Sequence, residues 1–216
     1  MHYRRNFAIQ ALVATVILIL VALPVDGDKV PALEESIFET INGAPGWLYR
    51  PFWPFMQFGN LLALPVVAVV MLFMKRWKVA LGLLVAMVAK LQLGAVVKDN
   101  VVRHRPAALL EDVTVRDDTG LGLAFVSGHV VVAVAIALIV HPWVSRGWRI
   151  VLWSLVAIVA VGRLYVGAHL PLDVVGGAAL GWAIGAAITV VIGPPRRIRS
   201  RRSERAVLRP SPEASL

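Results

Sequence analysis

Six stretches of the chain are apolar over nearly the length that a membrane-spanning helix requires. A transmembrane helix needs roughly 17–25 mainly apolar residues to cross the hydrocarbon core of a bilayer. Basic residues mark some of the ends, as Lys75 and Arg76 do after the second stretch. The pattern predicts an all-α, polytopic membrane protein whose six transmembrane helices cover approximately residues 7–24, 58–74, 79–97, 129–144, 150–166 and 174–192.

Two segments between the first and second stretches are too polar or too short to span. In residues 31–43, Leu33, Ile37 and Ile41 recur at helical spacing with acidic residues between them. This pattern predicts a short interfacial helix that lies along the membrane surface. Residues 46–60 are rich in aromatic side chains, which is typical of a belt at the membrane boundary.

The first apolar stretch follows Arg4 and Arg5 and has the flanks of a secretory signal peptide. No clean small-residue cleavage site follows it, so we expect an uncleaved anchor. We expect residues 1–193 to form one membrane domain. Residues 194–216 are rich in arginine, and we expect them to be a disordered cytoplasmic tail.

The composition agrees with a membrane protein. Of the 216 residues, 58% are apolar and 16% are charged, whereas soluble domains carry about 25% charged residues. Such a chain cannot cover its surface with polar groups, so most of that surface must face lipid. The absence of cysteine excludes disulfides and thiolate metal sites.

The net charge of +9 carries information about topology. With both termini on one side, that side receives 14 of the 22 basic residues, and the other face receives 11 of the 13 acidic ones. Basic residues accumulate on the cytoplasmic side of membrane proteins, which predicts that both termini are cytoplasmic. A tail that touches anionic lipid accounts for the remaining basic charge, and we expect no nucleic-acid partner.

The polar residues that could bind a ligand or catalyse a reaction gather at the outer ends of the predicted spans. Lys98 lies 20 residues after Lys78, about 30 Å along a helix, and Arg163 lies 14 residues after Arg149, about 21 Å. Spans that start at the cytoplasmic boundary therefore present their polar residues near the opposite one. The predicted cluster contains Lys98, Arg105, Ser127, Gly128, His129, Arg163, His169 and Asp173.

The charge balance of this cluster favours an anion. Lys98, Arg105 and Arg163 are cations, and Asp173 is one carboxylate, whereas a divalent metal site needs the reverse balance. Arginine forks match phosphate geometry. Ser127-Gly128 before a helix adds a hydroxyl and backbone N–H groups. The sequence predicts a phosphate site, and we expect neither a metal nor a cofactor.

Two histidines beside a bound phosphate indicate catalysis. A histidine can attack phosphorus when a carboxylate orients it, and Asp173 lies four residues after His169. His129 follows the Ser-Gly pair and could protonate the departing oxygen. We therefore interpret the cluster as an active site.

Three motifs occur in order along these spans. Together they resemble the signature of the type 2 phosphatidic acid phosphatase superfamily, a group of lipid phosphatases that shares its site with vanadium haloperoxidases and glucose-6-phosphatase. The resemblance covers approximately residues 7–193. The three motifs are Lys98-x6-Arg105-Pro106, Ser127-Gly128-His129 and Arg163-x5-His169-x3-Asp173.

The resemblance implies a role for each matching residue. His169 would form a phosphohistidine while Asp173 holds it, and His129 would act as general acid and then as general base. The phosphoryl oxygens would be held by Lys98, Arg105, Ser127, the Gly128 backbone and Arg163. Val126 stands where the family usually has proline, and Gly162 where it usually has serine. We expect these departures to tune the rate or the choice of substrate.

The expected function is the removal of phosphate from a membrane lipid at the extracytoplasmic face of the cell membrane. The chain resembles bacterial undecaprenyl-diphosphate phosphatases of the family, so a polyprenyl diphosphate is the first choice of substrate. Phosphatidic acid, phosphatidylglycerol phosphate and a polyprenyl-phosphosugar phosphate are alternatives. An anion transporter or channel would explain the cations, but it would explain neither His129 nor the spacing of His169 and Asp173.

Three polar residues find no certain place in this scheme. Lys90 lies within the third predicted span, where a lysine is costly enough to indicate a role. Arg103 and His104 could bind a second phosphate or belong to a solvated loop. The sequence does not indicate an oligomeric state.

Overall fold

A computed structural model describes residues 2–25, 28–117 and 122–193, which form helices, turns and loops without a strand. Short 3-10 turns, labelled η, extend or link the helices. The elements in chain order are α1 (His2–Ala22), η1 (Leu23–Val25), α2 (Ala32–Asn42), η2 (Gly46–Leu48), α3 (Tyr49–Met56), η3 (Gln57–Gly59), α4 (Ala63–Phe73), α5 (Trp77–Asn100), α6 (Pro106–Leu109), α7 (Gly128–Val140), η4 (His141–Trp143), α8 (Arg146–Tyr165) and α9 (Pro171–Ile192). The predicted tail, 194–216, lies outside the described residues.

Four helical segments are long and apolar enough to cross a membrane: His2–Val25, Trp77–Asn100, Arg146–Tyr165 and Pro171–Ile192. A fifth candidate is the pair Gly46–Gly59 and Ala63–Phe73, whose two parts meet at an angle of 68°. The remaining apolar helix, Gly128–Trp143, is shorter. The expected all-helical membrane protein is therefore confirmed, with four to five candidate spans among the described residues.

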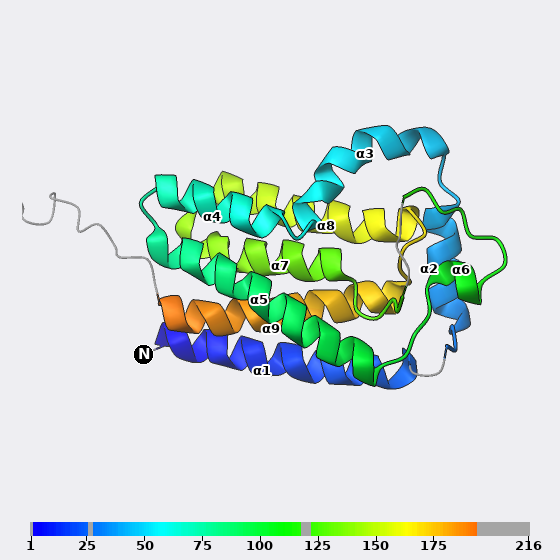
Figure 1. Ribbon diagram of the computed structural model, residues 1–216, viewed down its shortest axis with the longest axis horizontal. Helices are drawn as coiled ribbons and strands as arrows, with labels where there is room; N and C mark the ends of the chain where they lie inside the picture. Colours follow the sequence, from blue (N-terminus) through cyan, green and yellow to red (C-terminus); the bar gives the residue numbers. More distant parts are fainter. Residues whose placement is uncertain (1, 26–27, 118–121, 194–216) are drawn as a thin grey trace, which may run out of the picture.

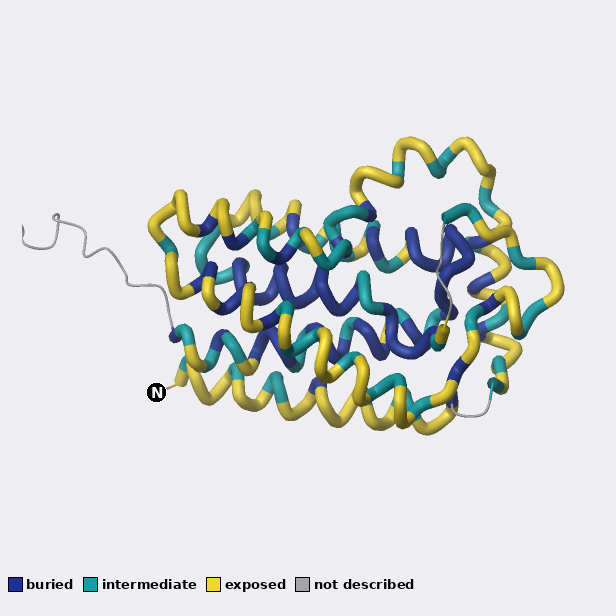
Figure 2. The backbone as a smooth tube through the Cα atoms, in the orientation of Figure 1, coloured by how far each residue is buried: buried dark blue, intermediate teal, exposed yellow. Residues whose placement is uncertain are grey.

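The long helices run side by side, and α7 lies in the middle of the bundle (Figure 1). After α4, α7 is the most apolar helix of the bundle. Every residue from Val130 to Val140 is buried (Figure 2). Its neighbours α5, α8 and α9 surround it. The apolar side chains of α7 are therefore covered by neighbouring helices and do not depend on contact with lipid.

Helix α9 approaches α7 closely because glycines line its contact face. A Cβ built on Gly181 would lie 2.5 Å from the carbonyl oxygen of Val131, and one on Gly177 would lie 2.7 Å from that of Ser127. Real Cβ atoms do not come so near to backbone. Small residues at four-residue spacing are a common means of packing helices in membranes, and here they bring α9 against the start of α7.

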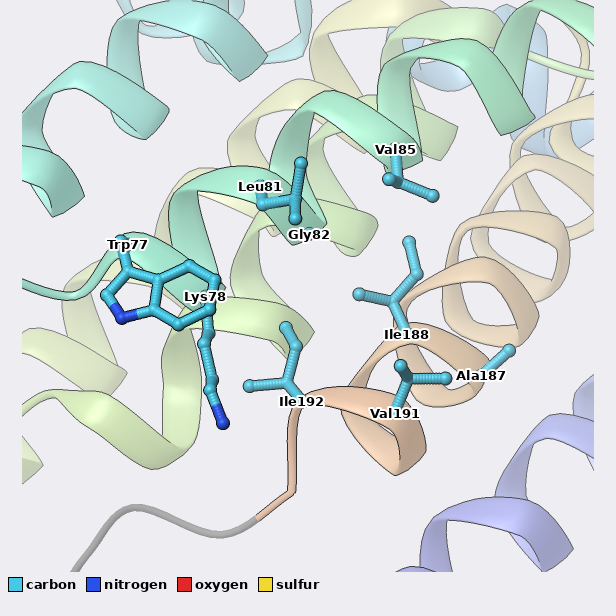
Figure 3. A pocket seen from close by; sticks show the side chains of 9 residues that line it. All are labelled: Trp77, Lys78, Leu81, Gly82, Val85, Ala187, Ile188, Val191 and Ile192. Atoms are coloured by element: carbon cyan, nitrogen blue, oxygen red, sulfur yellow. The ribbon is translucent and has the colours of Figure 1, made fainter.

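The outward faces of the outer helices are apolar. Large exposed apolar side chains occur on α1, α4, α5 and α8, and they include Leu12, Leu20, Val66, Leu81 and Ile150. An apolar groove between α5 and α9 is lined by Gly82, Ile188 and Ile192, among others (Figure 3). Such a surface matches lipid rather than water.

The second predicted span, 58–74, begins later than the sequence indicated. Residues 46–59 are helical pieces, and regular helix resumes at Ala63. The break lies at Asn60, whose side-chain Oδ1 accepts a hydrogen bond of 3.0 Å from the backbone N–H of Leu62. Asparagine stabilises such a turn in place of a helix.

Both ends of the described chain lie at one end of the bundle. α1 starts there and α9 finishes there (Figure 1), and a Cβ built on Gly193 would lie 3.7 Å from the guanidinium of Arg4. The last turns of α5 and α8 and the first turns of α7 and α9 lie at the opposite end, together with α2 and α6. That opposite end carries the predicted site.

Candidate active site

Four helices and one loop bring the predicted site residues to one end of the bundle. Lys98 stands in the last turn of α5, and Arg163 in the last turn of α8. Gly128 begins α7, and Asp173 lies in the first turn of α9. His169 occupies the loop between α8 and α9. Residues up to 75 positions apart in the sequence, from 98 to 173, thus share one region.

The charges of this region act on one another. Arg163 and Arg105 both act on His129 and on His169, and the two histidines also interact. Lys98 interacts with Arg105 and Asp173, and its Nζ donates a hydrogen bond of 2.9 Å to the carbonyl oxygen of Leu123. The structure therefore brings together all three predicted cations and both predicted histidines.

His169 and Asp173 form a buried pair. The Nδ1 atom of His169 lies 3.6 Å from Oδ2 of Asp173, just beyond ordinary hydrogen-bond distance. Burial lowers the pKa of His169 to about 4, against the opposing influence of Asp173. The imidazole is therefore neutral at pH 7. With Nδ1 turned to the carboxylate, Nε2 is the atom available to attack phosphorus.

The first turn of α9 holds Asp173 in place. Pro171 at the first helical position fixes the backbone, and Oδ2 of Asp173 accepts a hydrogen bond of 2.9 Å from the N–H of Leu170. The carbonyl oxygen of Asp173 accepts another, of 3.0 Å, from the N–H of Ser127. This second bond joins the histidine–aspartate pair to the start of α7.

Arg103 supplies the second side-chain partner of Asp173. Its guanidinium donates to Oδ1 of Asp173 at 3.0 Å, and to both carboxylate oxygens of Glu34 at 3.0 and 2.6 Å. Arg103 has no exposed surface at all. Of the two alternatives left open for Arg103, the solvated loop is therefore wrong, and the guanidinium is bonded to two carboxylates.

Glu34 was not identified from the sequence. It lies on α2, where the sequence pattern drew attention to the apolar residues Leu33 and Ile37, which are exposed, Leu33 to 75%. The buried face of α2 is instead Glu34, Phe38 and Asn42. Polar bonds dock this helix, because Oε1 of Glu34 also accepts from the N–H of Leu172 at 2.8 Å. The sequence signal was weak: Glu34 lies four positions before Phe38.

His104 takes part in a different pair on the surface. Its Nδ1 lies 2.6 Å from Oδ2 of Asp28, and its backbone N–H donates to Oδ1 at 2.8 Å. The backbone bond lowers the pKa of Asp28. The side chain of His104 is 54% exposed, so this histidine is part of a solvated segment, which was one of the two alternatives left open.

Several buried polar atoms point to an anion at the start of α7. The Oγ of Ser127 and the Nε of Arg163 are buried and have no hydrogen-bond partner among the described residues. Buried polar atoms are nearly always bonded. A phosphoryl group placed between α7 and α8 would supply acceptors for both, and the N-terminus of α7 would add backbone N–H groups.

A carboxylate near Arg163 was also missed. Oδ2 of Asp117 lies 3.5 Å from Nη1 of Arg163. The neighbouring residue, Arg116, anchors this loop by donating to the carbonyl oxygens of Tyr165 at 2.7 Å and Ala44 at 2.8 Å. Asp117 is therefore held near the phosphate site and can pair with Arg163.

Gly162 is explained by its packing. A Cβ at this position would lie 2.6 Å from Sδ of Met56, on α3. The serine that the family usually has here would collide with that side chain. Val126 is buried and contacts α9, because a Cβ on Gly176 would lie 2.9 Å from its Cγ1. Both departures thus accompany close contacts between helices.

No group of three or more His, Asp or Glu side chains that could hold a metal ion occurs among the described residues. The cations outnumber the carboxylates near His129, as the sequence indicated. The expectation that the reaction needs no metal stays a prediction.

Fold and site together define a class: a helical membrane protein with an anion site and a buried histidine–aspartate pair at one end of its bundle. Comparison with known families then identifies the particular one. The PAP2 superfamily matches residues 79–197, just over half of the chain, and the chain belongs to that superfamily. The family predicted from the three motifs, a family of lipid phosphatases, is confirmed.

Individual relatives are more distant. The undecaprenyl-diphosphatase of Sulfolobus acidocaldarius is 28% identical over 127 residues, which cover 58% of this chain and 59% of the relative. The chain therefore spans about three fifths of that relative's length. The crystal structure of LpxE from Aquifex aeolicus is similar with a TM-score of 0.67 and 28% identity, over 73% of this chain and 95% of that one.

A second solved structure is similar over more of the chain. It is a transmembrane PAP2-type phosphatidylglycerolphosphate phosphatase from Bacillus subtilis, with a TM-score of 0.72 and 23% identity. The similarity covers 88% of this chain and 99% of that one. At this identity, it supports the fold alone.

Proposed function

We propose that the protein is an integral-membrane lipid phosphatase that works through a phosphohistidine on His169. One observation carries the proposal: a neutral, buried imidazole is paired with a carboxylate beside three cations and a second histidine. An anion-binding protein needs the cations, but it has no use for an oriented nucleophile.

In the first step, the lone pair of His169 Nε2 forms a bond to phosphorus. The bond between phosphorus and the lipid oxygen breaks, and its electron pair stays on that oxygen. His129 donates a proton to the oxygen, so the lipid leaves neutral at this atom. Asp173 stabilises the positive charge that develops on the His169 ring, as a carboxylate does for a catalytic histidine.

In the second step, a water oxygen attacks the phosphorus of the phosphohistidine while His129 accepts a proton from that water. The P–N bond breaks, its electrons return to Nε2, and inorganic phosphate leaves. Lys98, Arg105, Ser127, Gly128 and Arg163 hold the phosphoryl oxygens in both steps, where they stabilise negative charge in the transition state. The residues account for the reaction without a metal ion.

We further propose that six segments cross the membrane, with α7 as the short, protein-enclosed sixth. Both termini are then cytoplasmic, and the site faces the extracytoplasmic side. The distribution of basic residues supports this orientation. The exposed apolar face of α2, with Leu33 and Ile37, supports its place at the interface, where it would lie against lipid.

The substrate class favoured is a polyprenyl diphosphate such as undecaprenyl diphosphate. The relative from Sulfolobus acidocaldarius, named for that activity, supports the choice. Phosphatidylglycerol phosphate stays an alternative, because it too carries a terminal phosphate. Phosphatidic acid and polyprenyl-phosphosugar phosphates carry the same terminal phosphate and belong in the same panel.

The test is phosphate release from lipid phosphates by the purified protein in detergent. We expect His169→Ala to lower kcat by on the order of 10³-fold or more, and His129→Ala by about 10²–10⁴-fold. His104→Ala, which removes an exposed histidine outside the site, serves as the matched control and should stay within about twofold of wild type.

If wild type and His169→Ala release phosphate at the same rate, the proposed nucleophile is wrong. If wild type releases none from any lipid but carries phosphate across liposome membranes, and His169→Ala carries it equally well, the protein is an anion transporter.

A further inference from the structure

Lys90 is a half-buried cation on α5 that the reaction described above does not use. It stands eight residues before Lys98, within a candidate membrane span. It makes no hydrogen bond or ion pair with any residue that the structure describes. A lysine in a membrane helix is costly unless a partner or a function compensates for it.

The side chain of Lys90 reaches the start of α7. A Cβ built on Gly128 would lie 3.4 Å from both Cε and Nζ of Lys90. The ammonium group is therefore next to the Ser127-Gly128-His129 turn, where the lack of a side chain at Gly128 leaves it room. Because Lys90 comes from deeper in the bundle than Lys98, it approaches this turn from the membrane side.

The charges around Lys90 are of its own sign. It acts on Lys98 and on His129, and these in turn experience Arg105 and Arg163. Asp173 is the carboxylate that acts on Lys98, and it is already bonded to Arg103. No described protein group thus neutralises Lys90, so its natural partner is an anionic group of the ligand.

A lipid phosphate is oriented by its tail. The phosphoryl group that His169 accepts is the outermost part, and the oxygen that departs leads inward to the lipid. His129, which would protonate this oxygen, is adjacent to Gly128. Lys90 therefore lies on the side of the leaving group.

The leaving group of a lipid monophosphate is an uncharged alcohol, whereas the leaving group of a lipid diphosphate is a charged lipid phosphate. We propose that Lys90 binds the leaving phosphate of a lipid diphosphate, and so gives the site its preference for diphosphates. The inference rests on the proposed phosphatase function and specifies its substrate class. When the bond between the terminal phosphorus and the bridging oxygen breaks, the electron pair remains on the departing phosphate, and Lys90 stabilises that charge.

The test compares two substrates that share one tail, farnesyl diphosphate and farnesyl monophosphate. For Lys90→Gln, we expect kcat/KM to fall by about 10–100-fold with the diphosphate, the range of a lost charge-assisted hydrogen bond. With the monophosphate the fall should be several times smaller. Lys90→Arg should keep most of the preference, because it keeps the charge.

Lys78→Gln is the matched control, since it removes the same charge from the far end of the same helix. It should leave the ratio of the two substrates as in wild type. An equal loss with both substrates would overturn the inference, because Lys90 would then act on the transferred group or on the fold. A Lys90→Gln variant with the wild-type kcat/KM for both substrates would overturn it as well.

Binding without turnover gives a second readout. In a His169→Ala background, inorganic pyrophosphate should bind more tightly than orthophosphate, and adding Lys90→Gln should abolish this difference. If wild type hydrolyses neither farnesyl substrate nor any other lipid phosphate, the proposed function itself fails. If wild type is active and the ratio and the pyrophosphate preference do not depend on Lys90, only the inference fails.

Discussion

Two histidine–aspartate pairs occur in the part of the chain that the structure describes, and they differ in almost everything except composition. His104 and Asp28 are only 2.6 Å apart, yet their side chains are 54% and 35% exposed. His169 and Asp173 are 3.6 Å apart and almost completely buried. The closer pair lies in solvent, and the more distant pair lies among the cations of the candidate site.

The difference shows that burial and further partners, rather than distance, make such a pair chemically useful. Water and salt screen an exposed ion pair, which contributes about 0.2–1 kcal/mol at most. Asp173 is instead fixed by Leu170 and Arg103, and Arg103 is fixed by Glu34. A carboxylate held from two sides can orient one nitrogen of His169 and leave the other free.

The largest effect that separates the two pairs should come from Asp173→Asn. The amide keeps the size of the side chain but can neither stabilise a positive ring nor select the same tautomer of His169. We expect kcat to fall by about 10³–10⁴-fold, as for a comparable histidine–aspartate pair in a serine protease. Steady-state phosphate release measures it.

The matched substitution in the exposed pair is Asp28→Asn. It should change kcat less than twofold, since surface changes of this kind are nearly neutral. If Asp28→Asn and Asp173→Asn reduced kcat equally, burial would not be what distinguishes the pairs.

A smaller effect should follow from loosening Arg103, which acts as a positioning residue. Arg103→Gln and Glu34→Gln should lower kcat by about 10–100-fold, the usual range for a residue that orients a ligand or catalytic group from behind. KM should change little, because neither residue contacts the phosphate. Arg103→Lys should restore part of kcat.

Glu35→Gln, at the next position of α2, is the control for Glu34→Gln, and thermal unfolding in detergent checks that each variant is folded. A higher KM with an unchanged kcat for Arg103→Gln would contradict the positioning role. That outcome would indicate that Arg103 contacts the substrate, as one alternative from the sequence held.

The smallest effects concern stability against acid, where the two pairs differ in the pH window. The pKa of His169 is lowered to about 4 by burial, against about 6.5 in an unfolded chain. The unfolded state therefore binds the extra proton between these values, and stability falls as pH drops from about 6.5 to about 4. The loss can reach about 3 kcal/mol.

For Asp28 the lowered pKa acts in a more acidic window. Its contribution is present above the unfolded value of about 3.9 and disappears as pH falls through the folded value. At this exposure it is worth about 0.5 kcal/mol. Unfolding in detergent at pH 6.5, 4.5 and 3.5 measures both, with His169→Ala and Asp28→Asn removing one contribution each. The loss between pH 6.5 and 4.5 should be smaller in His169→Ala than in wild type, and an equal loss in the two proteins would refute its assignment to His169.

The sequence indicated the residues of the candidate site, but it did not indicate the contacts that hold those residues in place. His169, Asp173 and Arg163 belong to one short motif, and helical spacing was enough to bring the motif to the end of the bundle. Glu34 could not be found in this way. It lies 69 positions before Arg103, and the apolar spacing of α2 favoured the opposite face.

Gly162 and the break at Asn60 were also beyond sequence patterns. The glycine depends on Met56, from a helix whose position against α8 no local pattern specifies. The start of the second span depends on a single side-chain hydrogen bond at Asn60, within a region that is apolar enough to continue as helix. Local periodicity predicts helices, but such tertiary contacts decide where they end and what they touch.

The most direct test of the central claim is the identification of the phosphorylated residue during turnover. The protein is mixed with radiolabelled lipid phosphate, quenched in alkali, which preserves phosphohistidine, and analysed by peptide mass spectrometry. We predict label on His169 in wild type and none in His169→Ala. Rapid phosphate release with no label on His169 would contradict the account.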